Sequence, residues 1–349
     1  MNKKSSHQVV TVADLARHLG LSAWTVSRAI NGHPEVREPT KQRIREAMAQ
    51  LGFRPNLFAR GLRGHGSGLV GVCFAGLHSP ILNTKLYHLQ EFLRRHQLRG
   101  LLEISLRDPQ NELRVIEDFL GFRVDGIVLI HSTLPAKDAS RLLAKIPSVS
   151  VDPHEPHTIT TVSLDRQMAM ELLLNHLLNL GHRSIALLGI GRTDAWRWPA
   201  LDSLARRRGL DPERLFAIVG NAQMAERGIE AGRGMAATVL GMTPRPTALL
   251  CLDDRVAVGA AQFIKMAGML IPRDFSITGF DNLDLARQLQ PTITTIEQNP
   301  SALMETAGEL LLAQISPARG RRPRAASRMI APALLTGEST GPAPGPAGG

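Results

Sequence analysis

Short apolar runs alternate with amphipathic stretches between residues 67 and 316. The apolar runs predict β-strands at Leu69–Phe74, Gly100–Ile104, Gly126–Ile130, Ser148–Val151, Ile185–Gly189, Phe216–Val219, Ala248–Leu252 and Ser276–Phe280. Most of the stretches between them carry apolar residues at helical spacing, as in Met168–Leu180. Continuous apolar strands that alternate with helices are typical of parallel sheets covered on both faces. The pattern therefore predicts an α/β fold for this region.

The number of predicted strands exceeds what one sheet of ordinary size needs, so we expect two α/β subdomains within residues 67–340. The N-subdomain would comprise about 67–160 and 295–322, and the C-subdomain about 161–294 and 325–340. Small ligands of such folds bind in the crevice outside the carboxyl ends of the strands. We therefore expect this region to be a ligand-binding and dimerising core.

The first fifth of the chain carries most of the excess positive charge. Residues 1–64 hold eleven Lys or Arg and four Asp or Glu, an excess of +7, while the whole chain has a formal net charge of +10. A charge that served only solubility would be spread more evenly along the chain. The asymmetry therefore indicates a nucleic-acid partner for the N-terminal region.

This basic region also has the pattern of three short helices. Thr11 followed by Asp14 resembles a capping box, and Gly20 marks the end of the first helix. Ser22 is a candidate N-cap for the second helix, and a third helix is predicted over Thr40–Leu51. The face of the second helix nearer to solvent consists of Ala23, Trp24, Thr25, Ser27, Arg28 and Asn31. The pattern predicts an all-α helix-turn-helix headpiece in residues 1–55, with a plain three-helix bundle as the alternative.

The run VTVADLARHLGLSAWTVSRAINGHPEVREPTKQRIREAMAQLGFRPNLFARGL, residues 10–62, resembles the N-terminus of the lactose-repressor (LacI) family. TVSRAIN, the Thr-Lys-x-Arg-Ile helix and PNxxARxL carry the resemblance. It implies base contacts by Ala23, Trp24 and Arg28. It also implies phosphate contacts by the polar groups of Thr11, Ser22, Thr25, Ser27, Asn31 and Asn56.

The resemblance implies a hinge over residues 56–66, which begin with NLFARGLR. In the family this helix folds only on DNA, pairs with its dimer mate and inserts a leucine into the minor groove. The match places Ala59 and Arg60 on the helix and the inserted leucine at Leu62. Gly61 departs from the pattern, because a glycine inside a helix costs ~1 kcal/mol relative to alanine. A plain linker is the alternative.

The α/β region is similar to the family's periplasmic-binding-protein-like core. GLVGV, FRVDGIVL, NLGHRSIALLG and GFDNLDLARQLQPTITTIEQ carry the similarity, and the GEST run at Gly337–Thr340 resembles the closing strand. The family pattern places effector-binding residues at Asp152, Thr193, Arg197, Asp253, Arg255 and Asp281.

Two departures from that pattern concern the effector. Asp253 stands where the family has an amide, and Arg255 replaces a residue that is often polar, so a simple sugar cannot be assumed. Trp196 and Trp198 either stack on a ligand ring or pack against the protein. Asp281 either binds the ligand or caps a strand end. The resemblance implies a sugar-like, sugar-acid or nucleoside effector.

These observations predict a sequence-specific DNA-binding transcriptional regulator, a repressor of carbohydrate-type genes controlled by a small molecule. The resemblance implies a homodimer on a near-palindromic double-stranded operator, and the chain lacks the leucine-heptad helix with which tetrameric members end. One alternative is a regulator that has lost or altered its effector response, or that activates. A solute-binding protein is a further alternative, which the helix-turn-helix opposes.

Several features are expected to be absent. The sequence has no metal-ligand spacing, phosphate loop or nucleophile motif, so we expect no enzyme activity, cofactor or metal. Cys73 and Cys251 lie in apolar runs and should be buried thiols. No apolar stretch is long enough to span a membrane and no signal peptide is evident, which favours a cytoplasmic protein. The Arg-rich loop 319–328 is either a solvated insertion or a contact for an anion, and 341–349 should be disordered.

Overall fold

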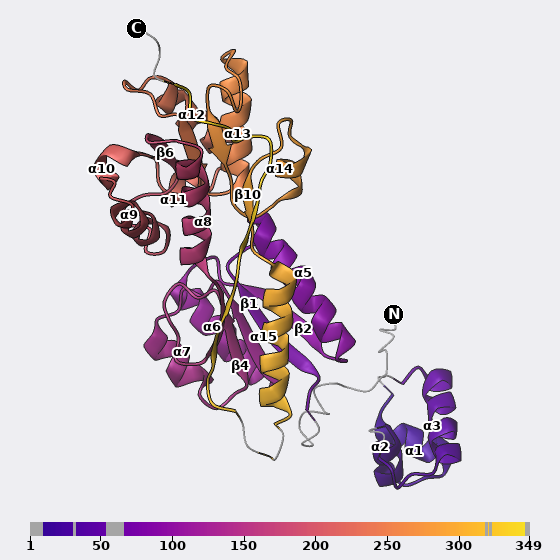
Figure 1. Ribbon diagram of the computed structural model, residues 1–349. Helices are drawn as coiled ribbons and strands as arrows, with labels where there is room; N and C mark the ends of the chain where they lie inside the picture. Colours follow the sequence, from indigo (N-terminus) through magenta and orange to yellow (C-terminus); the bar gives the residue numbers. More distant parts are fainter. Residues whose placement is uncertain (1–9, 31–32, 54–65, 318–319, 321–322, 346–349) are drawn as a thin grey trace, which may run out of the picture. The chain divides into compact units, whose positions relative to one another are not determined.

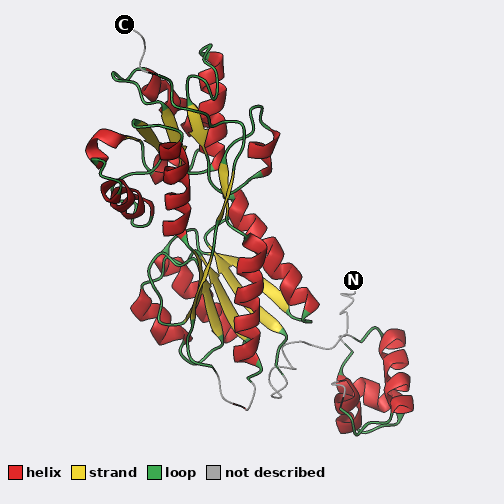
Figure 2. Cartoon of the chain, viewed as in Figure 1, coloured by secondary structure: helices red, strands yellow, loops and turns green. Residues whose placement is uncertain are grey.

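The computed structural model describes residues 10–30, 33–53, 66–317, 320 and 323–345. Contacts within the chain define two compact units, Met1–Leu69 with Leu120–Asp125, and Val70–Phe119 with Gly126–Gly349. Figure 1 traces the chain through both units, and Figure 2 distinguishes their helices from their strands. The first unit is helical, and the second combines helices with parallel sheets.

The first unit contains three helices, α1 (Val12–Leu19), α2 (Ala23–Ile30) and α3 (Glu38–Leu51). Their buried side chains form a small core of Leu15, Ala16, Val26, Ile44, Ala47 and Phe53. The apolar residues recur at helical spacing in each helix, so each presents one stripe to the others. The helix predicted over Thr40–Leu51 begins at Glu38 instead, because Pro39 fits the first turn, where a backbone N–H is not needed.

The ends of these helices follow the sequence signals. Thr11 accepts a hydrogen bond from the Asp14 backbone N–H, and the Asp14 carboxylate accepts from that of Thr11, so the predicted capping box is confirmed. Gly20 ends α1 with φ 64°, a conformation that favours glycine. Ser22 caps α2, since its Oγ accepts from the Thr25 backbone N–H at 3.0 Å. The turn between α1 and α2 is therefore fixed on both sides.

The predicted hinge over 56–66 lies outside the described residues except for Gly66. Asp125 fixes the chain directly after it, because its two carboxylate oxygens accept the backbone N–H groups of Ser67 and Gly68 at 2.7 Å each. This contact connects the start of the α/β region with the loop that precedes strand β3 (Gly126–Ile130).

The second unit contains a six-stranded sheet with the order β11-β5-β4-β3-β1-β2. Besides β3 its strands are β1 (Leu69–Phe74), β2 (Arg99–Ile104), β4 (Ser148–Val151), β5 (Thr160–Leu164) and β11 (Ser327–Ile330). Every adjacent pair from β11 to β1 is parallel. The helices around it are α5 (Pro80–Arg95), α6 (Pro109–Gly121), α7 (Ala136–Leu143) and α15 (Pro300–Ile315) (Figure 1).

A parallel four-stranded sheet has the order β7-β6-β8-β9. Its strands are β6 (Ile185–Leu188), β7 (Phe216–Val219), β8 (Ala248–Cys251) and β9 (Ser276–Thr278). The helices of this part are α8 (Arg166–Asn179), α9 (Arg197–Arg207), α10 (Pro212–Leu215), α11 (Ala222–Ala225), α12 (Ile229–Leu240), α13 (Asp254–Met266) and α14 (Asp284–Gln288). Strands β10 (Thr295–Glu297) and β12 (Ala333–Leu335) form a separate antiparallel pair.

The predicted fold class is confirmed, since one unit is a helical headpiece and the other combines helices with parallel sheets (Figure 2). Cys73 and Cys251 are buried free thiols, as predicted. Of the helices in the described part of the chain, none is both long and apolar enough to cross a membrane.

Three predicted boundaries need correction. Strands β5 and β11 lie in the six-stranded sheet, so residues 161–164 and 327–330 belong with the N-subdomain and not with the C-subdomain. Gly337–Thr340 is no strand but a turn, held by hydrogen bonds such as Ser339 Oγ to the Ile277 carbonyl at 2.6 Å. The first residues of the expected disordered tail are ordered, because the Gly341 and Ala343 backbone N–H groups donate to Ser276 Oγ and the Leu180 carbonyl.

Candidate functional site: a DNA-reading helix and a charged cluster in the core

Helix α2 carries the predicted DNA-contacting side chains. Ser22, Ala23 and Trp24 are exposed, and the Trp24 side chain is 65% exposed despite its size. Thr25, Ser27 and Arg28 are half-buried. A large aromatic ring with a role in the core would be buried. This exposed ring, on a headpiece with an excess of basic residues, is instead placed to contact another molecule.

Two of the predicted phosphate contacts have a second role in the headpiece. The Thr11 hydroxyl belongs to the capping box of α1, and the Ser22 hydroxyl caps α2 and lies 2.8 Å from Thr25 Oγ1. These groups therefore sit at helix N-termini, where backbone N–H groups favour anions. The remaining predicted contacts, Asn31, Asn56, Ala59, Arg60 and Leu62, lie outside the described residues.

Arg28 is held on several sides. Its guanidinium carbon lies 4.3 Å from the centre of the Trp24 ring, a cation–π contact. Arg28 NH1 forms an ion pair with Glu35 at 2.7 Å, and Arg28 NH2 lies 2.7 Å from His33 Nε2. Among the predicted base-contacting residues, Arg28 has the charge and the donor geometry to pair with a guanine.

In the core, the predicted effector residue Asp152 is buried at the end of β4. Its carboxylate binds Lys85 Nζ at 2.7 Å and Arg166 NH1 at 2.9 Å, and accepts the Leu164 backbone N–H at 2.9 Å. Burial disfavours its charge, but Arg166 and Lys85 outweigh this and hold the pKa of Asp152 below its usual range. Burial and the nearby Lys85 lower the pKa of His131, which lies 3.3 Å from Lys85 Nζ.

Arg197 lies at the start of α9, and Asp194 fixes it there. Arg197 NH1 donates to Asp194 Oδ2 at 2.9 Å, and its backbone N–H donates to Asp194 Oδ1 at 2.8 Å. The guanidinium carbon lies 5.7 Å from the centre of the Phe280 ring. Arg197 Nε is buried and has no hydrogen-bond partner among the described residues. Thr193, predicted beside it, is exposed.

Trp196 and Trp198 differ in their surroundings. Trp198 packs edge-on against Phe216 at 6.0 Å between ring centres and carries Arg192 over its face at 4.8 Å. Trp198 is therefore part of the packing between α9 and β7. Trp196 is 36% exposed, which leaves it free to contact a ligand.

Asp253 caps α13, because its Oδ1 accepts the Val256 backbone N–H at 2.9 Å. Its other oxygen, Oδ2, accepts from Arg255 NH2 at 2.6 Å and from Arg255 Nε at 3.0 Å. Arg255 NH1 also donates to the His78 carbonyl at 3.2 Å. Asp253 and Arg255 are the two departures from the family pattern, and they neutralise each other's charge as an ion pair.

Asp281 has an unusual backbone and an unusual charge state. Its φ is 105°, and its Oδ1 accepts a hydrogen bond from Gln298 Nε2. Burial and the neighbouring carboxylates of Asp253 and Asp254 raise the pKa of Asp281 to about 8. Burial likewise raises the pKa of Asp254 to about 7, although it accepts hydrogen bonds from Thr295 Oγ1 and the Leu283 backbone N–H. At neutral pH Asp281 therefore carries a proton that it can donate.

The structure brings most predicted effector residues into one charged cluster. Asp253 and Lys85 both act electrostatically on Asp281, and Lys85 also binds Asp152. Sequence reasoning missed four polar members of this cluster, which are Lys85, His131, Arg166 and Gln298, and it also missed Asp194, which holds Arg197. Lys85 could have been found, since it falls on the apolar stripe of α5 together with Ile81, Leu82, Leu89, Phe92 and Leu93.

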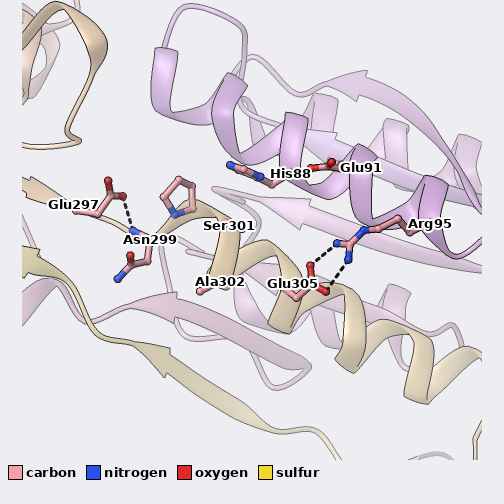
Figure 3. Close-up of a pocket in the computed structure, with 9 residues that line it drawn as sticks. His88, Glu91, Arg95, Glu297, Asn299, Ser301, Ala302 and Glu305 are labelled. Atoms are coloured by element: carbon pink, nitrogen blue, oxygen red, sulfur yellow. Dashed lines mark hydrogen bonds and ion pairs between the residues drawn. The ribbon is translucent and has the colours of Figure 1, made fainter. Parts of the chain in front are cut away.

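A groove of about 840 Å³ lies elsewhere, between α5 and the start of α15 (Figure 3). It is lined by His88, Glu91, Arg95, Glu297, Asn299, Pro300, Ser301, Ala302 and Glu305. Arg95 and Glu305 form an ion pair across it, with 2.5 Å between Arg95 NH2 and Glu305 Oε2. The groove shares none of its lining residues with the predicted effector set. Within the described residues, no group of three His, Cys, Asp or Glu is arranged to hold a metal ion.

Comparison with known proteins gives two family matches. Residues 11–56 match the model described as "Bacterial regulatory proteins, lacI family", and residues 174–340 match "Periplasmic binding protein-like domain". Catabolite control protein A of Priestia megaterium is 28% identical over 295 residues, which are 83% of this chain and 87% of that relative.

Solved structures agree on the fold. A lac repressor dimer bound to operator and an anti-inducer superposes with a TM-score of 0.83 at 22% identity, over 96% of this chain and all of that one. The regulator CelR in complex with cellobiose gives 0.66 at 20% identity, over 95% of this chain and 99% of that one.

A helix-turn-helix with an exposed tryptophan beside a half-buried arginine, followed by a periplasmic-binding-protein-like core, defines a class of DNA-binding transcriptional regulators. Residues 11–56 thus form a helix-turn-helix domain of the lacI family of bacterial regulatory proteins, and residues 174–340 a periplasmic-binding-protein-like domain, as the resemblance of residues 10–62 and of the α/β region predicted.

Proposed function

We propose that this regulator is a dimeric, cytoplasmic repressor of carbohydrate-type genes whose DNA affinity changes when a small hydroxylated molecule binds its core. The single observation that carries the proposal is the presence in one chain of a DNA-reading α2 and of a polar cluster with unmet hydrogen-bonding capacity. The same combination makes a catalytic role unnecessary to explain the site.

The unmet capacity supports a hydroxylated ligand. Arg197 Nε is a buried donor and Gln298 Oε1 a buried acceptor, and neither has a partner among the described residues. Asp281 adds a donor at neutral pH. Buried polar groups are nearly always hydrogen-bonded, so the hydroxyl groups of a sugar-like, sugar-acid or nucleoside ligand are the natural partners of these atoms. The cellobiose in the CelR structure is a ligand of this chemistry in a protein of the same fold.

Exposed apolar side chains support the dimer. On α5 and near its start Tyr87 is 64% exposed and Leu77 54% exposed, and Leu102 on β2 is 40% exposed. Strand β2 is the edge of its sheet. An edge strand and a neighbouring helix that expose large apolar residues form a surface suited to a second copy of the chain. The lac repressor dimer offers a precedent within the same fold.

Selection of binding sites from a random DNA pool tests the DNA-reading part. The full-length protein should enrich near-palindromes with half-sites about one helical turn apart. Arg28→Ala should relax the preference at one base pair per half-site, and the discrimination lost should be ~1–3 kcal/mol. Enrichment of single asymmetric half-sites would remove the dimer from the proposal, and a uniform loss across all sequences would make Arg28 a phosphate contact.

A second candidate is a regulator with an altered effector response. The observation that favours it is the Arg255–Asp253 ion pair, which occupies the side chain at the position where the family pattern has a ligand-binding amide. If Arg255→Ala created a ligand response that the native protein lacks, this candidate would replace the first.

A further inference from the structure

The turn after α2 contacts the side chain that the proposed function assigns to base reading. Arg28 lies in the last turn of α2 and its side chain is 25% exposed. The Trp24 ring covers the guanidinium at 4.3 Å, while Glu35 and His33 approach NH1 and NH2, each at 2.7 Å. A planar group with one face stacked and two nitrogens bound is fixed in both position and plane.

The contact with His33 also fixes the state of that ring. Arginine can only donate, so His33 Nε2 accepts from Arg28 and the ring proton lies on Nδ1. Nδ1 is buried without a hydrogen-bond partner among the described residues and lies 3.9 Å from Glu35 Oε2. Glu35 therefore directs a negatively charged oxygen at Arg28, and His33 directs a nitrogen lone pair at it.

The backbone of this turn is itself anchored. The His33 backbone N–H donates to the Arg28 carbonyl at 3.0 Å, and the Val36 backbone N–H donates to the His33 carbonyl at 3.3 Å. Val36 is buried. Glu35 and His33 are thus held by the fold of the headpiece and do not depend on the Arg28 contact for their place.

We propose that Glu35 and His33 are positioning residues for DNA reading, which hold the Arg28 guanidinium against Trp24 in the orientation that a guanine edge requires. The inference rests on the proposed base contact of Arg28. An arginine fixed in advance loses less conformational freedom on binding, so the gain appears as discrimination between base pairs and not as general affinity. Trp24, fixed by the same stack, then meets the neighbouring base pair.

The test compares two isosteric changes that remove the same charge. Glu35→Gln removes the negative charge that pairs with Arg28, so it weakens that contact. Glu38→Gln removes a headpiece carboxylate that pairs with Arg45 at 2.6 Å instead, so it is the matched control. Kd is measured with the full-length protein for the site selected by the wild type and for the same site altered at the base pair where Arg28→Ala relaxes preference. Melting curves confirm that each variant is folded.

The ratio of the Kd for the altered site to the Kd for the selected site should fall about two- to fivefold in Glu35→Gln. It should stay at the wild-type value in Glu38→Gln. Both variants should gain similar affinity for unrelated DNA, because each loses one negative charge near phosphates. His33→Ala should lower the ratio in the same direction. An unchanged ratio in Glu35→Gln overturns the inference, and a raised ratio overturns it too, since the contact would then compete with base reading. If Arg28→Ala does not relax the preference at any base pair, the proposed base contact of Arg28 is wrong. That result is distinct from an unchanged ratio in Glu35→Gln, which overturns only the positioning role.

Discussion

Asp281→Asn should make the stability of the free protein less dependent on pH. Asp281 lies beside Asp253 and Asp254 in the core, and burial raises its pKa to about 8 from an ordinary value of 3.8. Asparagine keeps the shape and can still hydrogen-bond to Gln298, but it cannot ionise. The substitution therefore removes the cost of a charge at this position and little else.

The direction and size of this pH dependence follow from proton linkage. Between pH 4 and 8 the folded state holds a proton on Asp281 that the unfolded chain has released, so the free energy of unfolding falls as pH rises. The slope is at most ~1.4 kcal/mol per pH unit, and from pH 5 to 8 the wild type loses at most about 4 kcal/mol through this group. The stability of Asp281→Asn relative to the wild type should rise by the same amount over that range.

Urea denaturation of both proteins at pH 5, 6, 7 and 8 measures this difference. Asp274→Asn is the control, because the hydrogen bond from Arg273 lowers the pKa of that half-buried carboxyl. Its contribution is complete above pH 4, so its effect on stability should be flat from pH 5 to 8. A difference between Asp281→Asn and wild type that changes by less than about 0.3 kcal/mol per pH unit refutes a protonated Asp281 at neutral pH.

Four further substitutions have outcomes that can be measured. Thr11→Ala should lower headpiece stability by ~1 kcal/mol in thermal melts, because the capping box of α1 is lost; no change would mean that water caps the helix equally well. His182→Ala should cost ~2–4 kcal/mol by urea denaturation, because it leaves Thr247, Ser276 and the Gly341 carbonyl without a shared partner. Leu62→Ser should lose DNA bending in gel assays but keep weak nonspecific binding; Gly61→Ala should tighten binding.

Much of the fold was predictable because apolar strands are visible in a sequence. Strands β3, β4 and β7 occur at the predicted residues, since GIVLI, SVSV and FAIV are short and apolar or β-branched. Strand β5 escaped because its threonines look polar, yet Thr160 is buried and its Oγ1 lies 3.3 Å from Gln314 Nε2. Strand β11 escaped because Ser327–Ile330 is mostly exposed at a sheet edge and shows no alternation.

The candidate site was predictable from the sequence where a short motif defines the local backbone geometry. Gly20 and the Thr11–Asp14 pair have local geometry that a short motif defines. The partners of Asp152 come from distant segments, with Lys85 67 positions before it, so spacing along the chain carries no signal for that ion pair. The turn that holds Arg28 was likewise invisible, since it depends on how His33 and Glu35 fold back onto α2.

Ligand binding in the core should control DNA affinity, and the Kd for the selected site tests this control most directly. A thermal-shift screen of sugars, sugar acids and nucleosides first finds a compound that raises the Tm of the wild type. That compound should then change the Kd for the site at least about fivefold in the wild type and leave Arg197→Ala unaffected, although the variant binds DNA normally. A compound that stabilises the core but leaves the wild-type Kd unchanged, or acts equally on Arg197→Ala, would contradict the account.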